Sequence, residues 1–211
     1  MRSLGIPFEE TVISLSDSAF TKKVTVVSEA GLVPVLVDGD VKVWETLAIL
    51  EYLAETFPEK ALWPTERAAR AHARAISAEM HAGFAALRSA CPMNLGKRFA
   101  RRDRGADVTA NVSRFCSLVR EARTRFGEPA GGPYLYGAFS GADAMYAPLV
   151  TRLDTYDLEV DRVTRTYMDA VLGSEAFREW LAAALREDWI VVEDEVDEPA
   201  IENLRPHLAT C

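Results

Sequence analysis

The sequence is poor in the residues that form disulfide frameworks and metal sites. Its 211 residues include three cysteines, Cys91, Cys116 and Cys211, and three histidines. An odd number of widely spaced cysteines favours free thiols in a reducing cytoplasm over disulfides. His72 and His207 have no acidic or cysteine partner at metal-ligand spacing, so we predict no metal site.

Positive charge is also scarce. The chain has 24 Lys and Arg against 32 Asp and Glu, which gives a net charge of −8. This balance argues against nucleic acid or an anionic membrane as the main partner, because both attract basic surfaces. The sequence contains no apolar run of about 18 residues and no signal-peptide pattern at its start. With 49% hydrophobic and 27% charged residues, the composition predicts a folded, acidic protein of the cytoplasm.

The most informative segment is residues 31–46. It predicts a strand with Pro34 near its start, a tight Asp-Gly turn, a second strand and then a helix. Thr46 is the predicted N-cap of that helix, whose apolar positions continue to Phe57. The helix start would present free N–H groups, a hydroxyl and the Glu45 carboxylate together. Such a group suits the ammonium and carboxylate of an amino-acid end-group, although an ordinary hairpin and capped helix explain the same residues.

The rest of the first part is patterned more weakly. Residues 9–15 carry three consecutive β-branched residues and predict a strand, and a short helix is expected over residues 20–27. Pro58 and Pro64 interrupt the pattern twice, so we place a linker there.

Beyond Pro64 the pattern is helical throughout. We expect a long helix over residues 65–90, four further helices and a loose end after Glu193. The four are a helix capped by Asp107 and running to Phe126, a helix over residues 140–155, a short helix that Gly173 ends, and a last helix capped by Ser174. Ser140 and Asp143, preceded by Phe139, form a predicted capping box of structural importance.

In this order and spacing, the residues resemble the cytosolic glutathione S-transferases, of a Ser-type, zeta-like kind. The resemblance implies an α/β plus all-α fold, with an incomplete thioredoxin-like domain over residues 1–63 and an all-helical domain over residues 65–211. It implies that Val33 and a cis Pro34 bind the cysteinyl part of glutathione through the backbone. It also implies that Glu45 and Thr46 hold its γ-glutamyl end.

The resemblance leaves the catalytic residue unknown. Relatives carry a Tyr, Ser or Cys after a first strand, and the alignment places that strand and turn upstream of Met1. We do not transfer the role to Ser3. Three explanations for the missing strand stay open. The start codon is assigned too late or the chain is cleaved, the sheet pairs without that strand, or subunits exchange strands. Leu32 also replaces a lysine that many relatives use for the glycyl carboxylate.

For the electrophile site we select Met80, His81 and Phe84, although a Met and Phe stripe at helical spacing more often belongs to the core.

Cys91 is expected to be a buried thiol. A basic cluster is expected to be a solvated helix face, with a dimer interface as the alternative; it comprises Lys97, Arg98, Arg101, Arg102 and Arg104.

The resemblance therefore predicts a cytoplasmic enzyme that uses glutathione as co-substrate and conjugates a hydrophobic electrophile. A homodimer is expected from the family. The alternative function is a non-catalytic binding or scaffold protein of the same fold. The intact Glu45-Thr46 pair favours the enzyme, whereas Leu32 and the unassigned donor favour the scaffold.

Overall fold

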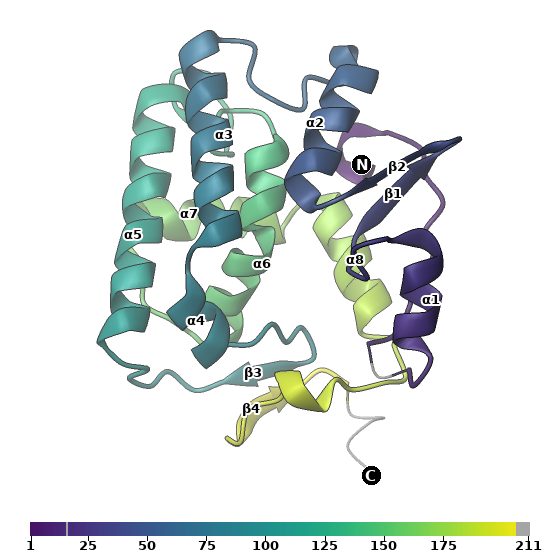
Figure 1. Cartoon of the computed structure of the whole chain (residues 1–211). Coiled ribbons are helices and arrows are strands. Elements are labelled where there is room, and N and C mark those ends of the chain that lie inside the picture. The colour runs from purple at the N-terminus through teal and green to yellow at the C-terminus, as the bar shows by residue number, and fades with distance from the viewer. Residues whose placement is uncertain (16, 206–211) are drawn as a thin grey trace.

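The computed structural model describes residues 1–15 and 17–205 (Figure 1). The first part of the chain combines short helices with a single hairpin. Its elements are η1 (Arg2–Leu4), α1 (Phe20–Val27), β1 (Val35–Asp38), β2 (Val41–Trp44), α2 (Thr46–Thr56) and η2 (Pro58–Lys60).

The hairpin has the predicted position. Strands β1 and β2 are antiparallel, with Val35 opposite Trp44 and Asp38 opposite Val41. Gly39 begins the two-residue loop with φ of 57°, a conformation that glycine adopts without strain. The Tyr52 hydroxyl of α2 donates to Asp38 Oδ2 at 2.8 Å and so ties the hairpin to the helix.

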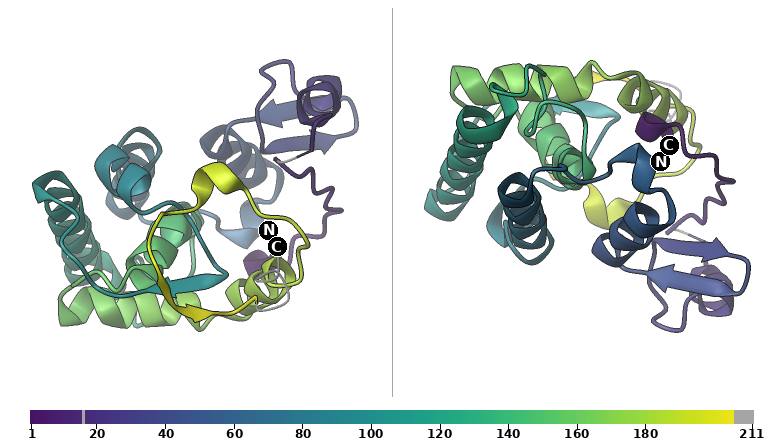
Figure 2. Two further views of the ribbon diagram at one scale, coloured as in Figure 1. Left: turned by 90° about the horizontal axis from the view of Figure 1, so that it is seen from below. Right: turned by 90° about the horizontal axis from the view of Figure 1, so that it is seen from above.

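The predicted strand over residues 9–15 is wrong. These residues form an irregular, extended segment along the outside of the molecule (Figure 2). Val12 and Leu15 are 61% and 54% exposed. β-Branched residues favour a strand only where a partner strand lies beside them. The predicted helix over residues 20–27 is confirmed as α1, which buries Val24 completely.

The second part of the chain is mainly helical. Its elements are α3 (Arg67–Ala82), α4 (Ala85–Ala90), β3 (Lys97–Phe99), α5 (Ala106–Ala122), the π-helical η3 (Arg123–Gly127), α6 (Gly141–Thr155), α7 (Arg162–Leu172), α8 (Glu175–Ala184), η4 (Val192–Asp194) and β4 (Ala200–Asn203).

Two predicted helix ends need correction. The helix expected over residues 65–90 divides at Gly83 and Phe84, where Phe84 has φ of 59° and interrupts the helical backbone. Asp107 does not cap α5. That helix begins after Gly105, whose φ is 94°, and Asp107 lies inside its first turn. A negative side chain is favourable in both positions, so the sequence pattern does not separate them.

Two other helix starts agree with the prediction. Ser140 and Asp143 form the capping box of α6, and the Ser174 hydroxyl accepts the Phe177 N–H at the start of α8. Gly173 follows the last residue of α7, as expected.

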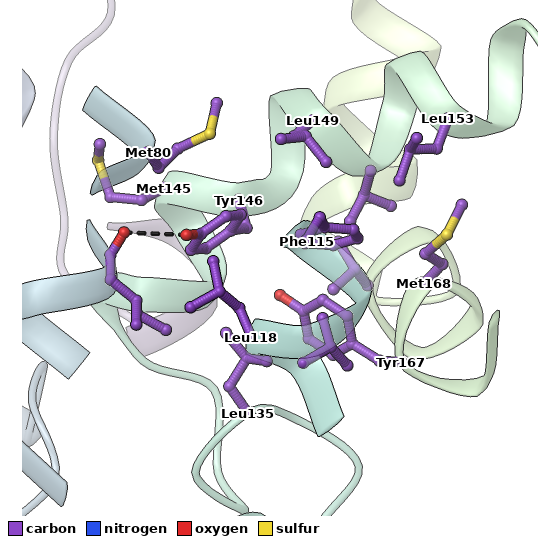
Figure 3. Close-up of a cluster of buried hydrophobic side chains, with 14 of the residues drawn as sticks. Met80, Phe115, Leu118, Leu135, Met145, Tyr146, Leu149, Leu153, Tyr167 and Met168 are labelled. Atoms are coloured by element: carbon purple, nitrogen blue, oxygen red, sulfur yellow. Dashed lines mark hydrogen bonds between the residues drawn. The ribbon is translucent and has the colours of Figure 1, made fainter. Parts of the chain in front are cut away.

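Two hydrophobic clusters hold the chain together. The larger one joins the helices from Trp63 onward, and its centre contains Phe115, Tyr146 and Tyr167 (Figure 3). The Tyr146 hydroxyl donates to the Ile76 carbonyl at 2.9 Å, which links α6 to α3. The smaller cluster consists of Leu53 of α2 together with Ile6 and Leu62. The expected division of the chain between residues 63 and 65 falls between these clusters and stays a prediction.

The basic cluster does not lie on a helix face, because Lys97 and Arg98 belong to β3, and its role as a dimer interface stays a prediction. Strand β4 pairs with β3, and acidic residues of the C-terminal segment meet the basic ones. Lys97 Nζ lies 2.5 Å from Glu195, and Arg104 lies 2.9 Å from Glu198, with both members of that pair almost fully buried. We expected a loose end after Glu193. Up to residue 205, this segment is instead held against β3 and the basic residues. His207 and Cys211 lie outside the described residues.

Within residues 1–15 and 17–205, no helix is long and apolar enough to cross a membrane. The same residues contain no cluster of three side chains suited to hold a metal ion.

Candidate glutathione-binding site

The four predicted binding residues lie at the open end of the hairpin. Val33 and Pro34 directly precede β1, and Glu45 and Thr46 directly follow β2. Because Val35 is paired with Trp44, the residues flanking this pair emerge at the same end of the sheet. The Val33–Pro34 peptide bond is cis, as the resemblance implies. Val33 is 51% exposed, so this residue lies at the surface.

Glu45 is the N-cap of α2, which corrects the prediction that Thr46 holds this position. Its φ is 69°, in the left-handed region that non-glycine residues rarely occupy. Such a conformation costs about 1–3 kcal/mol and is often found where a binding site requires it. The Glu45 carboxylate is 47% exposed and does not bond to its own helix. It is therefore free to meet a ligand.

The first turn of α2 supplies donors. The first intrahelical bond runs from the Ile49 N–H to the Glu45 carbonyl at 2.9 Å. Among the described residues, the N–H groups of Thr46, Leu47 and Ala48 have no hydrogen-bond partner. Unpaired N–H groups and the positive end of the helix dipole attract a carboxylate. The α2 start thus presents donors for an anion beside a carboxylate for a cation.

The three electrophile candidates separate in the structure. Met80 and Phe84 are each 6% exposed and belong to the larger core cluster, where the Phe84 ring packs 6.1 Å from Tyr146. His81 is half exposed, and its Nε2 lies 3.8 Å from Glu45 Oε2. The structure therefore brings only His81 to the surface beside the predicted glutathione residues. The sequence pattern did not indicate this contact, because it depends on how α3 packs beside α2.

Three further residues, Ser28, Leu32 and Cys91, offer no catalytic group. Ser28, 1% exposed, accepts the Leu32 N–H at 3.3 Å and holds the segment that leads to Val33. The Leu32 side chain is 57% exposed and provides no charge. Cys91 is fully buried, as predicted, and burial raises the pKa of its thiol to about 11. It is unsuited to be a nucleophile.

The N-terminal part of the chain matches a known family model. Residues 1–61 match the glutathione S-transferase N-terminal domain. The chain is 38% identical over 84 residues to a probable maleylacetoacetate isomerase of Caenorhabditis elegans, which is 39% of each chain. It is 38% identical over 78 residues to glutathione S-transferase Z2 of Arabidopsis thaliana, or 35% of this chain and 31% of that one. These alignments span less than two-fifths of the relatives' own length.

Solved structures match over most of the chain. A maleyl pyruvate isomerase, described as a bacterial zeta-class glutathione S-transferase, has a TM-score of 0.64 at 21% identity, over 89% of this chain and 90% of that one. A glutathione transferase homolog from Burkholderia, solved with bound glutathione, has a TM-score of 0.63 at 22% identity, over 86% and 85% of the two chains.

The fold is thus that of a thioredoxin-like unit followed by a helical bundle. Residues 1–61 match the N-terminal domain of the glutathione S-transferases, and the chain is similar to zeta-class members of that family.

Proposed function

We propose that the protein binds glutathione and transfers its thiolate to a hydrophobic electrophile. The observation that carries this proposal is the arrangement at the start of α2. The Glu45 carboxylate, the unpaired first-turn N–H groups and the exposed residue Val33 lie at one end of the hairpin. A tripeptide with a zwitterionic head and an extended backbone is complementary to all three.

Each group has a distinct part in binding. The Glu45 carboxylate accepts hydrogen bonds from the ligand's α-ammonium, and the N–H groups at Thr46 donate to its α-carboxylate. The backbone of the exposed residue Val33 pairs with the cysteinyl residue of the ligand. A free thiol has a pKa of about 8.5, so transfer requires a group that stabilises the thiolate. We assign that role to no described residue.

The substrate class stays broad. The chain resembles both a probable maleylacetoacetate isomerase and, at 35% identity over 65 residues, the dichloromethane dehalogenase of Methylorubrum extorquens. The substrates for which these two relatives are named differ strongly in size and polarity. We therefore propose a hydrophobic electrophile without naming one, and a homodimer as the assembly.

The first test measures glutathione binding by Glu45→Gln. The substitution removes the negative charge and keeps the side-chain size. A hydrogen bond to a charged group is worth about 1.5–3 kcal/mol, so glutathione affinity should fall about 10- to 150-fold in calorimetry. Glu55→Gln, an exposed change near the other end of α2, is the matched control and should bind normally. Equal affinity of the two variants, both folded by circular dichroism, contradicts the site.

The rival function is a binding or scaffold protein without transferase activity. The exposed Leu32 in place of a cation favours it. Conjugation of glutathione to a chloronitrobenzene substrate separates the two functions. Binding accompanied by turnover supports the enzyme, whereas binding without turnover supports the rival.

A further inference from the structure

His81 and Glu45 meet from different elements. His81 lies in the last turn of α3, and Glu45 is the N-cap of α2. Their side-chain atoms Nε2 and Oε2 are 3.8 Å apart, and the two side chains are 50% and 47% exposed. This separation is too long for a direct hydrogen bond, but it is close enough for both atoms to contact the same small group.

Neighbouring charged groups already have other partners. On α3, Arg74 forms a bidentate pair with Glu51 of α2, at 2.9 and 2.7 Å. Glu79 forms another with Arg114 of α5, at 2.6 and 2.8 Å. On α6, the Tyr146 hydroxyl is bonded to the Ile76 carbonyl. Among the described residues, Glu45 is thus the one acidic side chain with an oxygen within 4 Å of a His81 ring nitrogen.

We propose that neutral His81 is a second acceptor for the α-ammonium of glutathione, beside Glu45. The inference rests on the proposed function and assigns His81 to the head-group site rather than to the electrophile. An ammonium about 2.8 Å from each acceptor fits two atoms that are 3.8 Å apart. The imidazole must then carry its proton on Nδ1, so that Nε2 has a free lone pair.

Protonation reverses the role of His81. An imidazolium has no acceptor nitrogen, and its positive charge pairs with Glu45 in place of the ligand's ammonium. Glutathione and a proton therefore compete for this pair. Where His81 is protonated, binding of glutathione therefore releases that proton to solvent.

The test is calorimetric titration of the full chain with glutathione from pH 8.0 to pH 5.5. Imidazole groups gain their proton over this range, whereas the ammonium and carboxylates of glutathione keep their charges. We expect wild-type affinity to fall about tenfold across the range, because protonation of the imidazole competes with the ligand's ammonium for Glu45. Buffers of different ionisation enthalpy should report proton release at the acidic end of the range.

Two variants of His81 distinguish a role in binding the ligand from a role in holding the fold. His81→Gln keeps an acceptor oxygen but does not titrate, so its affinity should stay near the wild-type value at pH 8.0 and remain constant down to pH 5.5. His81→Leu should bind more weakly than the wild type at pH 8.0, also without pH dependence. His72→Asn is the matched control, since His72 faces Tyr136 rather than Glu45, and it should keep the full pH dependence.

A ligand control uses the glutathione analogue with a glutaryl group in place of γ-glutamyl, which lacks the ammonium. Its binding should not depend on pH. Wild-type binding of glutathione that is constant from pH 8.0 to 5.5, and equal in His81→Gln, overturns the role of His81 and leaves the proposed function standing. No glutathione binding by the wild type at any pH overturns both.

Discussion

At the scale of single residues, His72 shows how burial sets the behaviour of an ionisable side chain. Its Nδ1 lies 2.6 Å from the Tyr136 hydroxyl, and its ring packs 5.4 Å from Phe126. Burial lowers the pKa of His72, while the charge of Glu121, 3.5 Å from Nε2, acts in the opposite direction. The folded protein therefore holds this imidazole neutral more strongly than the unfolded chain does.

This shift predicts a pH dependence of stability. The unfolded chain binds the proton first, so the His72 contribution is present above its ordinary pKa of about 6.5 and is lost as pH falls below it. His72→Asn keeps a polar group near the Tyr136 hydroxyl but does not titrate. Urea unfolding at pH 7 and pH 5 should show a smaller loss of stability for this variant than for the wild type.

An identical loss of stability between pH 7 and pH 5 in His72→Asn and the wild type would contradict the assignment to His72.

The positions of the candidate binding residues are predictable where the order along the chain defines them. A strand, a turn and a helix start follow one another, and this order places Val33, Pro34, Glu45 and Thr46 at one end of the hairpin. The N-cap was placed one residue too late, since the positive φ of Glu45 is unusual for its residue type. The contact between His81 and Glu45 joins two helices, and no local pattern contains that information.

At the scale of elements, the start of α6 depends on one buried carboxylate. Asp143 has no exposed surface and accepts hydrogen bonds from the N–H of Leu135, at 3.1 Å, and from the N–H and hydroxyl of Ser140, both at 2.8 Å. Burial is the largest influence on its pKa, which is raised to about 6. The hydrogen bonds make this position tolerable for a carboxylate.

Asp143→Asn should therefore destabilise the protein strongly. The amide has one acceptor oxygen in place of two and turns an NH₂ group toward existing donors. A buried donor left without a partner costs about 1–3 kcal/mol, so we expect a loss of about 2–4 kcal/mol in urea unfolding. Asp161→Asn is the matched control. Asp161 caps α7 at a partly exposed position, and its replacement should cost about 1 kcal/mol or less. Equal losses in the two variants would contradict the role given to Asp143.

Elements with a local signature were predicted well, whereas those that depend on distant partners were not. Helices α6 and α8 have a capping residue and an apolar period in one continuous segment. Strand β3 has only three residues, and it forms because β4, about 100 residues later, lies beside it. Residues 9–15 have a strand-like composition but no neighbouring strand, and they stay irregular.

At the scale of the whole molecule, the exposed apolar surface is distributed unevenly. Of thirteen exposed large hydrophobic side chains in the described residues, nine lie between Phe8 and Trp44. The hairpin that carries several of them has two strands, and a two-stranded sheet packs weakly by itself. A concentration of exposed apolar side chains commonly marks an interaction surface.

We therefore expect the chain to form a homodimer through this N-terminal surface. Sedimentation velocity should show a species of twice the chain mass that increases with protein concentration. Because each chain carries a net charge of −8, added salt should screen the repulsion and strengthen the dimer. Val37→Lys, on the exposed side of β1, should weaken it. Val192→Lys, at a still more exposed site in η4, should not. A monomer at every concentration and salt level would exclude this assembly, and an equal effect of the two lysines would place the contact elsewhere.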